Sequence, residues 1–104
     1  TKEDKNVAIN TLASSGTINL VDNSINTISP SDAIVFVLPQ VANTSVFHQI
    51  FVQLNMASAV SITLGTSKII GSMPVLSAGG KFNIIYEYRN DLLDWTVGVV
   101  AITG

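Results

Sequence analysis

The alternation of side chains over residues 81–89 constrains the fold more than any other feature of this sequence. Every second residue is large and apolar, and the residues between are polar except for Ile85. A period of two is the signature of a strand with one buried face. Residues 90–94 have turn chemistry, and a second alternation runs from Trp95 to Ile102. We therefore predict a β-hairpin over residues 79–102, with a core face made of Phe82, Ile84, Tyr86 and Tyr88.

The amino-acid composition favours a single all-β domain. The 104 residues suffice for one small core, and Ile and Val together number 24 against 8 Leu. β-Branched residues fit a pleated surface better than a helix. Short strand-like segments alternate with turn signals, and neither a helical period nor an internal repeat is evident. The prediction is an antiparallel β-sandwich or jelly-roll-like module of about eight short strands.

Four segments carry more specific expectations about the arrangement of the chain. Residues 1–14 are predicted to be an N-terminal lead-in, and residues 15–104 the β-sandwich module. Within the module, residues 17–21 and 25–28 flank a turn and are predicted to form an early hairpin. Residues 33–38 are uniformly apolar, which suits a central strand covered on both faces.

The low charge of the chain points to self-association. Only 12% of the residues are charged, where about 25% is usual, while 47% are hydrophobic. Such a surface has little electrostatic protection, so we expect part of it to meet another subunit. The net charge of −2 leaves no basic stripe for nucleic acid. No apolar run approaches the ~20 residues that cross a bilayer, so membrane insertion is not expected.

Residues 46–54 are predicted to form a long strand with two unlike faces. One face is apolar apart from His48. Two phenylalanines between glutamines on the other face indicate contact with something besides water. The candidates for a subunit interface are therefore Phe47, Gln49, Phe51 and Gln53.

The residues that could carry catalysis lack partners in the sequence. His48 is the only histidine, and a lone histidine is more often hydrogen-bonded in a core or at an interface than catalytic or bound to zinc. There is no Gly-x-Ser-x-Gly elbow. Glu87, Asp91 and Asp94 cluster near the hairpin tip, where carboxylates usually face solvent, although a pair in a cleft could act on a glycosidic bond. We predict no catalytic residue, no metal site and no cofactor.

Aromatic residues near the hairpin tip offer a possible ligand site. Trp95 with Tyr86 and Tyr88 could stack on a sugar ring, while Asn and Asp side chains bind hydroxyl groups. The alternation places both tyrosines on the predicted core face, so core packing is the favoured role. The candidates for a ligand contact are Tyr88, Asn90, Asp91 and Trp95.

Five stretches together have a recognisable style. They are residues 15–20 (SGTINL), 33–39 (AIVFVLP), 61–65 (SITLG), 76–80 (LSAGG) and 94–98 (DWTVG). This order, ending in a glycine turn, an aromatic strand and a Trp-x-Val strand, resembles β-rich modules in the fibre and baseplate proteins of tailed bacteriophages. The resemblance spans about residues 15–102. It implies a virion structural protein, usually a homotrimer, that contacts other virion proteins or presents a surface to the host.

Two functions of different classes are therefore open. The first is a non-enzymatic structural module in a head fibre, tail fibre or baseplate, located in the virion and assembled through its apolar faces. The second is a receptor-binding, lectin-like head that binds a host glycan. An enzyme is the third and least supported possibility, because only His48 speaks for it.

Overall fold

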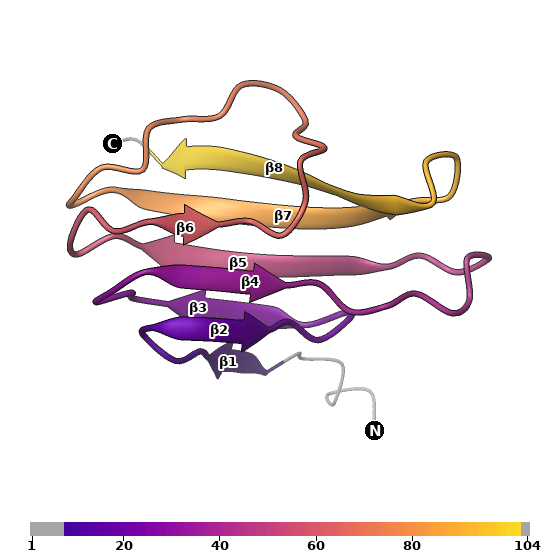
Figure 1. The fold of residues 1–104 in the computed structure, drawn as a ribbon, viewed down its shortest axis with the longest axis horizontal. Coiled ribbons are helices and arrows are strands. Elements are labelled where there is room, and N and C mark those ends of the chain that lie inside the picture. The colour runs from indigo at the N-terminus through magenta and orange to yellow at the C-terminus, as the bar shows by residue number, and fades with distance from the viewer. Residues whose placement is uncertain (1–7, 103–104) are drawn as a thin grey trace.

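The computed structural model describes residues 8–102, which contain eight strands and no helix (Figure 1). The strands are β1 (Ile9–Thr11), β2 (Gly16–Asn19), β3 (Ile25–Ile28), β4 (Ile34–Val37), β5 (Gln49–Asn55), β6 (Ile62–Thr63), β7 (Lys81–Arg89) and β8 (Asp94–Ile102). The prediction of an all-β domain is confirmed. Of the predicted lead-in, residues 1–7 lie outside the described residues, whereas residues 9–11 form β1.

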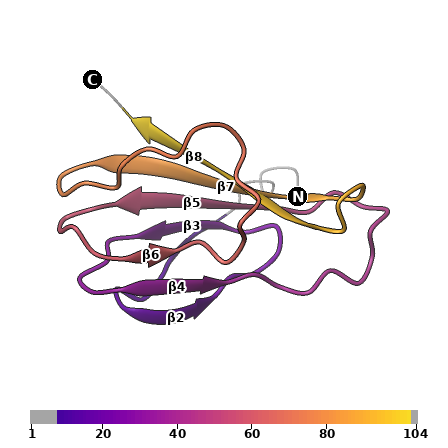
Figure 2. The same ribbon diagram turned by 45° about the horizontal axis from the view of Figure 1, so that its top comes forward.

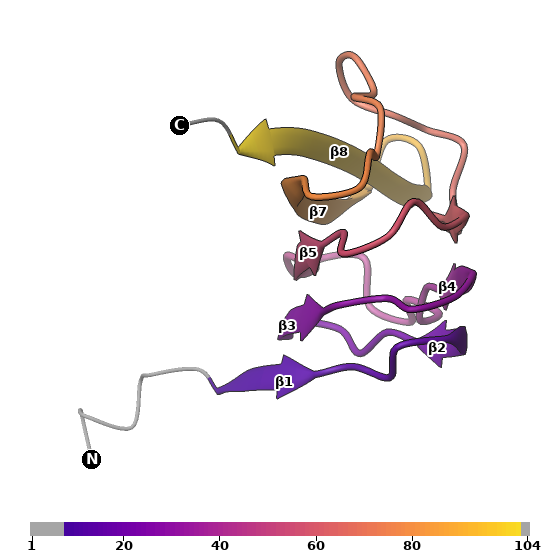
Figure 3. The same ribbon diagram turned by 90° about the vertical axis from the view of Figure 1, so that its left-hand side faces the viewer.

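The chain alternates between two facing sheets. The larger sheet has the order β1-β3-β5-β7-β8, and the smaller has the order β2-β4-β6. Figures 2 and 3 show the two sheets on opposite sides of the domain. From β1 to β6 the chain winds around a common core and places each strand beside the one two positions earlier. This is the topology of a short parallel β-helix.

The predicted antiparallel pairing holds for only part of the domain. The pairs β1–β3, β2–β4, β3–β5 and β4–β6 are all parallel. The predicted early hairpin over residues 17–28 is wrong, because β2 and β3 belong to different sheets. The turn at Asn23, whose φ is 56°, leads the chain across the core rather than back along the same sheet. A turn signal shows that the chain changes direction but not which sheet it enters.

The predicted C-terminal hairpin is confirmed. β7 and β8 pair antiparallel along their whole length, from Lys81 opposite Ile102 to Arg89 opposite Asp94. Tyr86 is buried, and its hydroxyl donates a 2.7 Å hydrogen bond to the Leu64 carbonyl of the facing layer. Burial raises the pKa of this phenol. The hairpin extends the larger sheet beyond β5. Residues 68–70 run beside the outer edge of β8 and hydrogen-bond with Val97.

The core lies between the two sheets, and β4 contributes to it with one face only. Ile34 and Phe36 are buried, and the Phe36 ring meets that of Tyr86 edge-to-face at 6.4 Å. Val35 and Val37 point outward and are 40% and 41% exposed. The prediction that residues 33–38 are covered on both faces is therefore wrong. A uniformly apolar run has no period, so the sequence could not show which face lacked a cover.

A short internal repeat, which was not recognised in the sequence, lies in β1 and β3. Ile-Asn-Thr occurs at residues 9–11 and again at 25–27, and the two copies lie side by side in register. The Asn10 amide approaches the side-chain oxygen of Asn26 at 3.5 Å, and the Asn26 amide donates to the Phe51 carbonyl at 3.1 Å. Asparagine side chains thus connect three successive strands of the larger sheet.

Replacing Phe36 tests the one-sided burial of β4. Phe36→Ala should lower the free energy of unfolding by about 3–5 kcal/mol, because it removes a ring packed between the sheets. Val37→Ala is the matched control on the outward face of the same strand and should cost about 0.5 kcal/mol or less. Urea unfolding followed by circular dichroism measures both values. Equal losses would contradict this arrangement.

Candidate functional site

An apolar row crosses the outer face of the five-stranded sheet. The strand register places one residue from each strand side by side, namely Ile9, Ile25, Phe51, Ile85 and Gly98. Along β3, β5 and β7 these residues alternate with buried ones, so they point away from the core. Neighbouring strands lie about 4.8 Å apart, which gives the apolar row a length of about 20 Å.

The rows on either side are largely polar and almost uncharged. One consists of Thr11, Thr27, Gln53, Asn83 and Val100, and the other of Gln49, Glu87 and Thr96. Glu87 is the only charged residue in the apolar row and its two flanking rows. An apolar centre depleted of charge is the composition typical of the core of a protein interface.

The four predicted interface residues lie on this face or beside it. Gln49, Phe51 and Gln53 alternate with buried residues along β5. Phe47 precedes β5, and its side chain is 62% exposed. Phe47 and Phe51 line a common surface cavity of about 310 Å³ together with Ile25. The sequence did not point to Ile25, Ile85 or Gly98, because their alignment depends on the strand register.

His48 anchors the segment that carries Phe47. Its imidazole is buried between the β2–β3 turn and the loop before β5. Nδ1 contacts the carboxylate oxygen Oδ2 of Asp22, and Nε2 lies 2.6 Å from the backbone carbonyl oxygen of Asn43. When Asp22 is ionised, both partners are acceptors only, so both ring nitrogens must donate. The contacts therefore select the imidazolium form.

The surroundings of His48 agree with this protonation state. The Asn43 carbonyl and then the Asp22 carboxylate raise the pKa of His48 above its ordinary value of 6.5, against the opposing effect of burial. The rings of Tyr88 and Trp95 pack edge-on against the imidazole, with centroids at 5.9 and 6.5 Å. The expectation of a hydrogen-bonded core histidine agrees with this geometry, although the sequence did not identify Asp22 and Asn43 as its partners.

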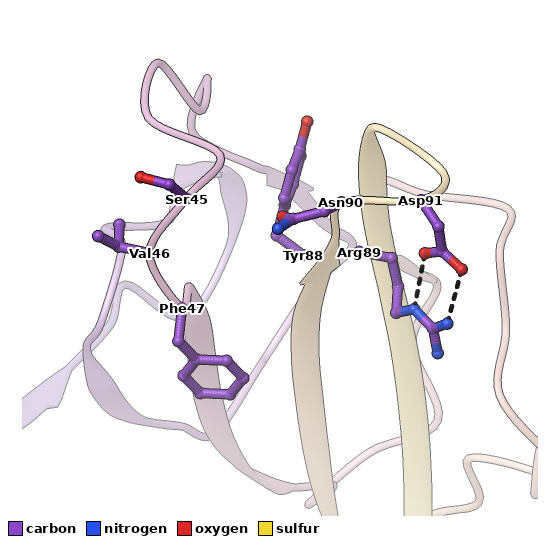
Figure 4. Close-up of a pocket in the computed structure, with 7 residues that line it drawn as sticks. All are labelled: Ser45, Val46, Phe47, Tyr88, Arg89, Asn90 and Asp91. Atoms are coloured by element: carbon purple, nitrogen blue, oxygen red, sulfur yellow. Dashed lines mark hydrogen bonds and ion pairs between the residues drawn. The ribbon is translucent and has the colours of Figure 1, made fainter.

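A second cavity, of about 430 Å³, lies at the tip of the β7–β8 hairpin and is lined by residues 45–47 and 88–91 (Figure 4). Tyr88 and Asn90 lie between the 45–47 segment and the Arg89–Asp91 pair. Arg89 donates to both carboxylate oxygens of Asp91, at 3.0 and 2.8 Å, and lowers the pKa of Asp91. Three of the predicted ligand-contact residues, Tyr88, Asn90 and Asp91, therefore meet here.

Trp95, the fourth predicted contact, does not line this cavity. Its side chain is only 4% exposed, and the indole N–H donates to the Pro39 carbonyl at 3.0 Å. The neighbouring Asp94 pairs with Lys68 at 3.0 Å, and this contact lowers the pKa of Asp94. Asp91 and Asp94 thus have separate cationic partners, and the Trp95 ring packs edge-on against the rings of His48 and Tyr88.

Residues 8–102 hold no group of three or more His, Cys, Asp or Glu side chains placed to bind a metal ion. In the same range there is no helix whose length and apolar character would let it span a bilayer. Comparison of the chain with protein-family models, curated proteins and solved structures found no match. The function must therefore be inferred from the faces and cavities of the chain itself.

The stability of the fold should depend on pH through His48. Because the folded-state pKa is raised, the contribution of His48 is complete below about pH 6.5 and is lost as the pH rises through the folded pKa. The melting temperature of the native chain should therefore fall over this window relative to His48→Gln, whose side chain does not titrate. Thermal unfolding of both proteins between about pH 5 and pH 9 measures the difference. Parallel profiles would rule out the imidazolium contact with Asp22.

Proposed function

We propose that this chain is a non-enzymatic structural module that assembles with copies of itself, as a homotrimer, through the outer face of the five-stranded sheet. The observation that carries the proposal is the apolar row of Ile9, Ile25, Phe51, Ile85 and Gly98. Within residues 8–102, no second layer of strands packs on that side of the larger sheet (Figure 3). A continuous apolar patch on an open face is typical of a protein contact surface.

The size of this face supports a stable contact. β7 and β8 are nine residues long, and a strand rises about 3.3 Å per residue. The other three strands are shorter, at seven, four and three residues, so with strands about 4.8 Å apart the face covers roughly 500 Å². A specific interface buries about 500 to 800 Å² on each partner. One sheet face of this chain therefore reaches the lower end of what assembly requires.

We further place the module in a fibre or baseplate of a tailed bacteriophage. The resemblance of about residues 15–102 to such modules supports this placement, and a homotrimer is the usual state of those modules. The chain would attach a fibre to the particle or be displayed at its surface. Its partners would be its own copies and other virion proteins, and its location the virion.

Mass measurement tests the assembly. Light scattering during size-exclusion chromatography should give about 33 kDa, three times the 11.0 kDa of one chain. Phe47→Ala combined with Phe51→Ala should shift the mass to that of a monomer, because an aromatic residue at the centre of an interface contributes about 2 kcal/mol or more. Val35→Ala with Val37→Ala, on the outer face of the other sheet, is the matched control and should stay trimeric. A native chain that runs as a monomer at all concentrations would refute the proposal.

A receptor-binding, lectin-like role is the second candidate, and the cavity at the hairpin tip favours it. Tyr88 offers a partly exposed ring, and Asn90 offers an amide that both donates and accepts hydrogen bonds. Sites of this kind combine an apolar surface with a few polar groups that fix the orientation of the ligand. The ligand would be a glycan of the host surface.

Saccharide binding tests this second role. A glycan array with the native chain should identify a ligand, and Asn90→Ala should then weaken its binding about tenfold, because the loss leaves polar groups of the sugar unpaired. Asn83→Ala, on the outer face of β7 and away from the tip, is the control and should bind normally. A silent array would exclude the lectin-like role without affecting the assembly proposal.

A further inference from the structure

A notch lies at one end of the apolar row, over Gly98. The missing side chain leaves a hollow of about 250 Å³ lined by Ile70, Ile85 and Val100, which we call the Gly98 notch. A Cβ atom at residue 98 would approach only the Ile70 carbonyl oxygen, at 3.9 Å. The φ angle of Gly98 is not positive, so β8 does not need glycine for its backbone conformation. A glycine inside a strand often marks a place where another molecule comes close.

The Gly98 notch has the size and chemistry to take an aromatic ring. An apolar cavity of about 150 Å³ is already enough to hold benzene. The walls are apolar except for Glu87. Because the edge of an aromatic ring carries partial positive charge, a carboxylate beside the notch favours an aromatic occupant over an aliphatic one.

The chain itself presents one aromatic side chain of the required kind. All of its aromatic residues lie within residues 8–102, and Phe47, at 62%, is the most exposed of them. Phe47 cannot fill the notch of its own chain. In the strand register Gly98 is aligned with Phe51, two strands away, and Phe47 precedes Phe51 by four residues. Phe47 and Gly98 are therefore about 16 Å apart.

Building on the assembly proposed above, we propose that Phe47 of one copy inserts into the Gly98 notch of the neighbouring copy. The occupant is a second copy because the apolar row and its two flanking rows carry one charged residue, Glu87, and because the same face carries both halves of the contact. Phe47 and the Gly98 notch are different patches, so the contact is heterologous, and repeating it closes a ring when the rotation between copies permits. A ring of three copies accounts for a homotrimer in which every Phe47 is covered.

Filling the notch tests the contact without disturbing the core. Gly98→Leu has room in the isolated chain, and it should raise the concentration needed for half-assembly at least about tenfold. Gly98→Ala adds one methyl group and should have a much smaller effect. Light scattering over a concentration series measures both, and thermal unfolding at a monomeric concentration checks that each variant is folded.

Engineered cysteines provide a second measurement that does not depend on filling the notch. The native chain has no cysteine, so Gln49→Cys combined with Val100→Cys introduces the only pair and keeps Phe47 in place. Within one chain these residues lie about 16 Å apart along the register, far beyond the ~7 Å that a disulfide spans. Mild oxidation should therefore give a covalent trimer on a denaturing gel, while each single-cysteine variant should stay monomeric.

The outcomes separate this proposal from the one on which it rests. A native chain that is monomeric overturns both. A native trimer in which Gly98→Leu assembles normally and the cysteine pair does not cross-link overturns the Phe47 contact alone. Efficient cross-linking of Gln49→Cys by itself would show that the Phe47 sides of two copies meet each other, and this also overturns the proposal.

Discussion

The pairing of β5 with β3 on one side and β7 on the other holds the two halves of the domain together. β5 pairs in parallel with β3 over four residues and antiparallel with β7 over seven. Its inward residues Ile50, Val52 and Leu54 are buried in the core shared by both sheets. In the N-terminal half, the strands β1 to β4 have only three or four residues each. The β7–β8 hairpin by itself would be a two-stranded ribbon of marginal stability. Each half therefore depends on β5 for a neighbour.

The parts of the fold that were predictable are those determined by residues close together in the sequence. The β7–β8 hairpin has a period of two, a turn and a return strand within 22 residues, and the sequence shows all three. The parallel pairs join residues that lie 16 to 28 positions apart, such as Ile9 with Ile25 and Ile34 with Ile62. No local signal specifies such a pairing, and its one trace is the Ile-Asn-Thr repeat.

The candidate sites follow the same division. Alternation along one strand was enough to separate Gln49, Phe51 and Gln53 from the core face of β5. The neighbours that turn Phe51 into part of an apolar row come from four other strands, so the sequence did not identify them. Trp95 was a ligand candidate because its ring could stack on a sugar, but its indole N–H is satisfied by Pro39 inside the domain. A buried partner 56 residues away has no sequence signal.

The burial of His48 and the exposure of Phe47 depend on each other, because the two residues are adjacent in the sequence. Successive side chains of an extended segment point to opposite sides, so burial of His48 turns Phe47 outward. An apolar residue at position 48 could also be buried, but it could not specify the path of the loop through contacts with Asp22 and Asn43. Charged, hydrogen-bonded contacts have strict geometry, whereas apolar packing tolerates several arrangements. A polar anchor behind an apolar contact residue therefore holds that residue in one place, which a specific interface between copies requires.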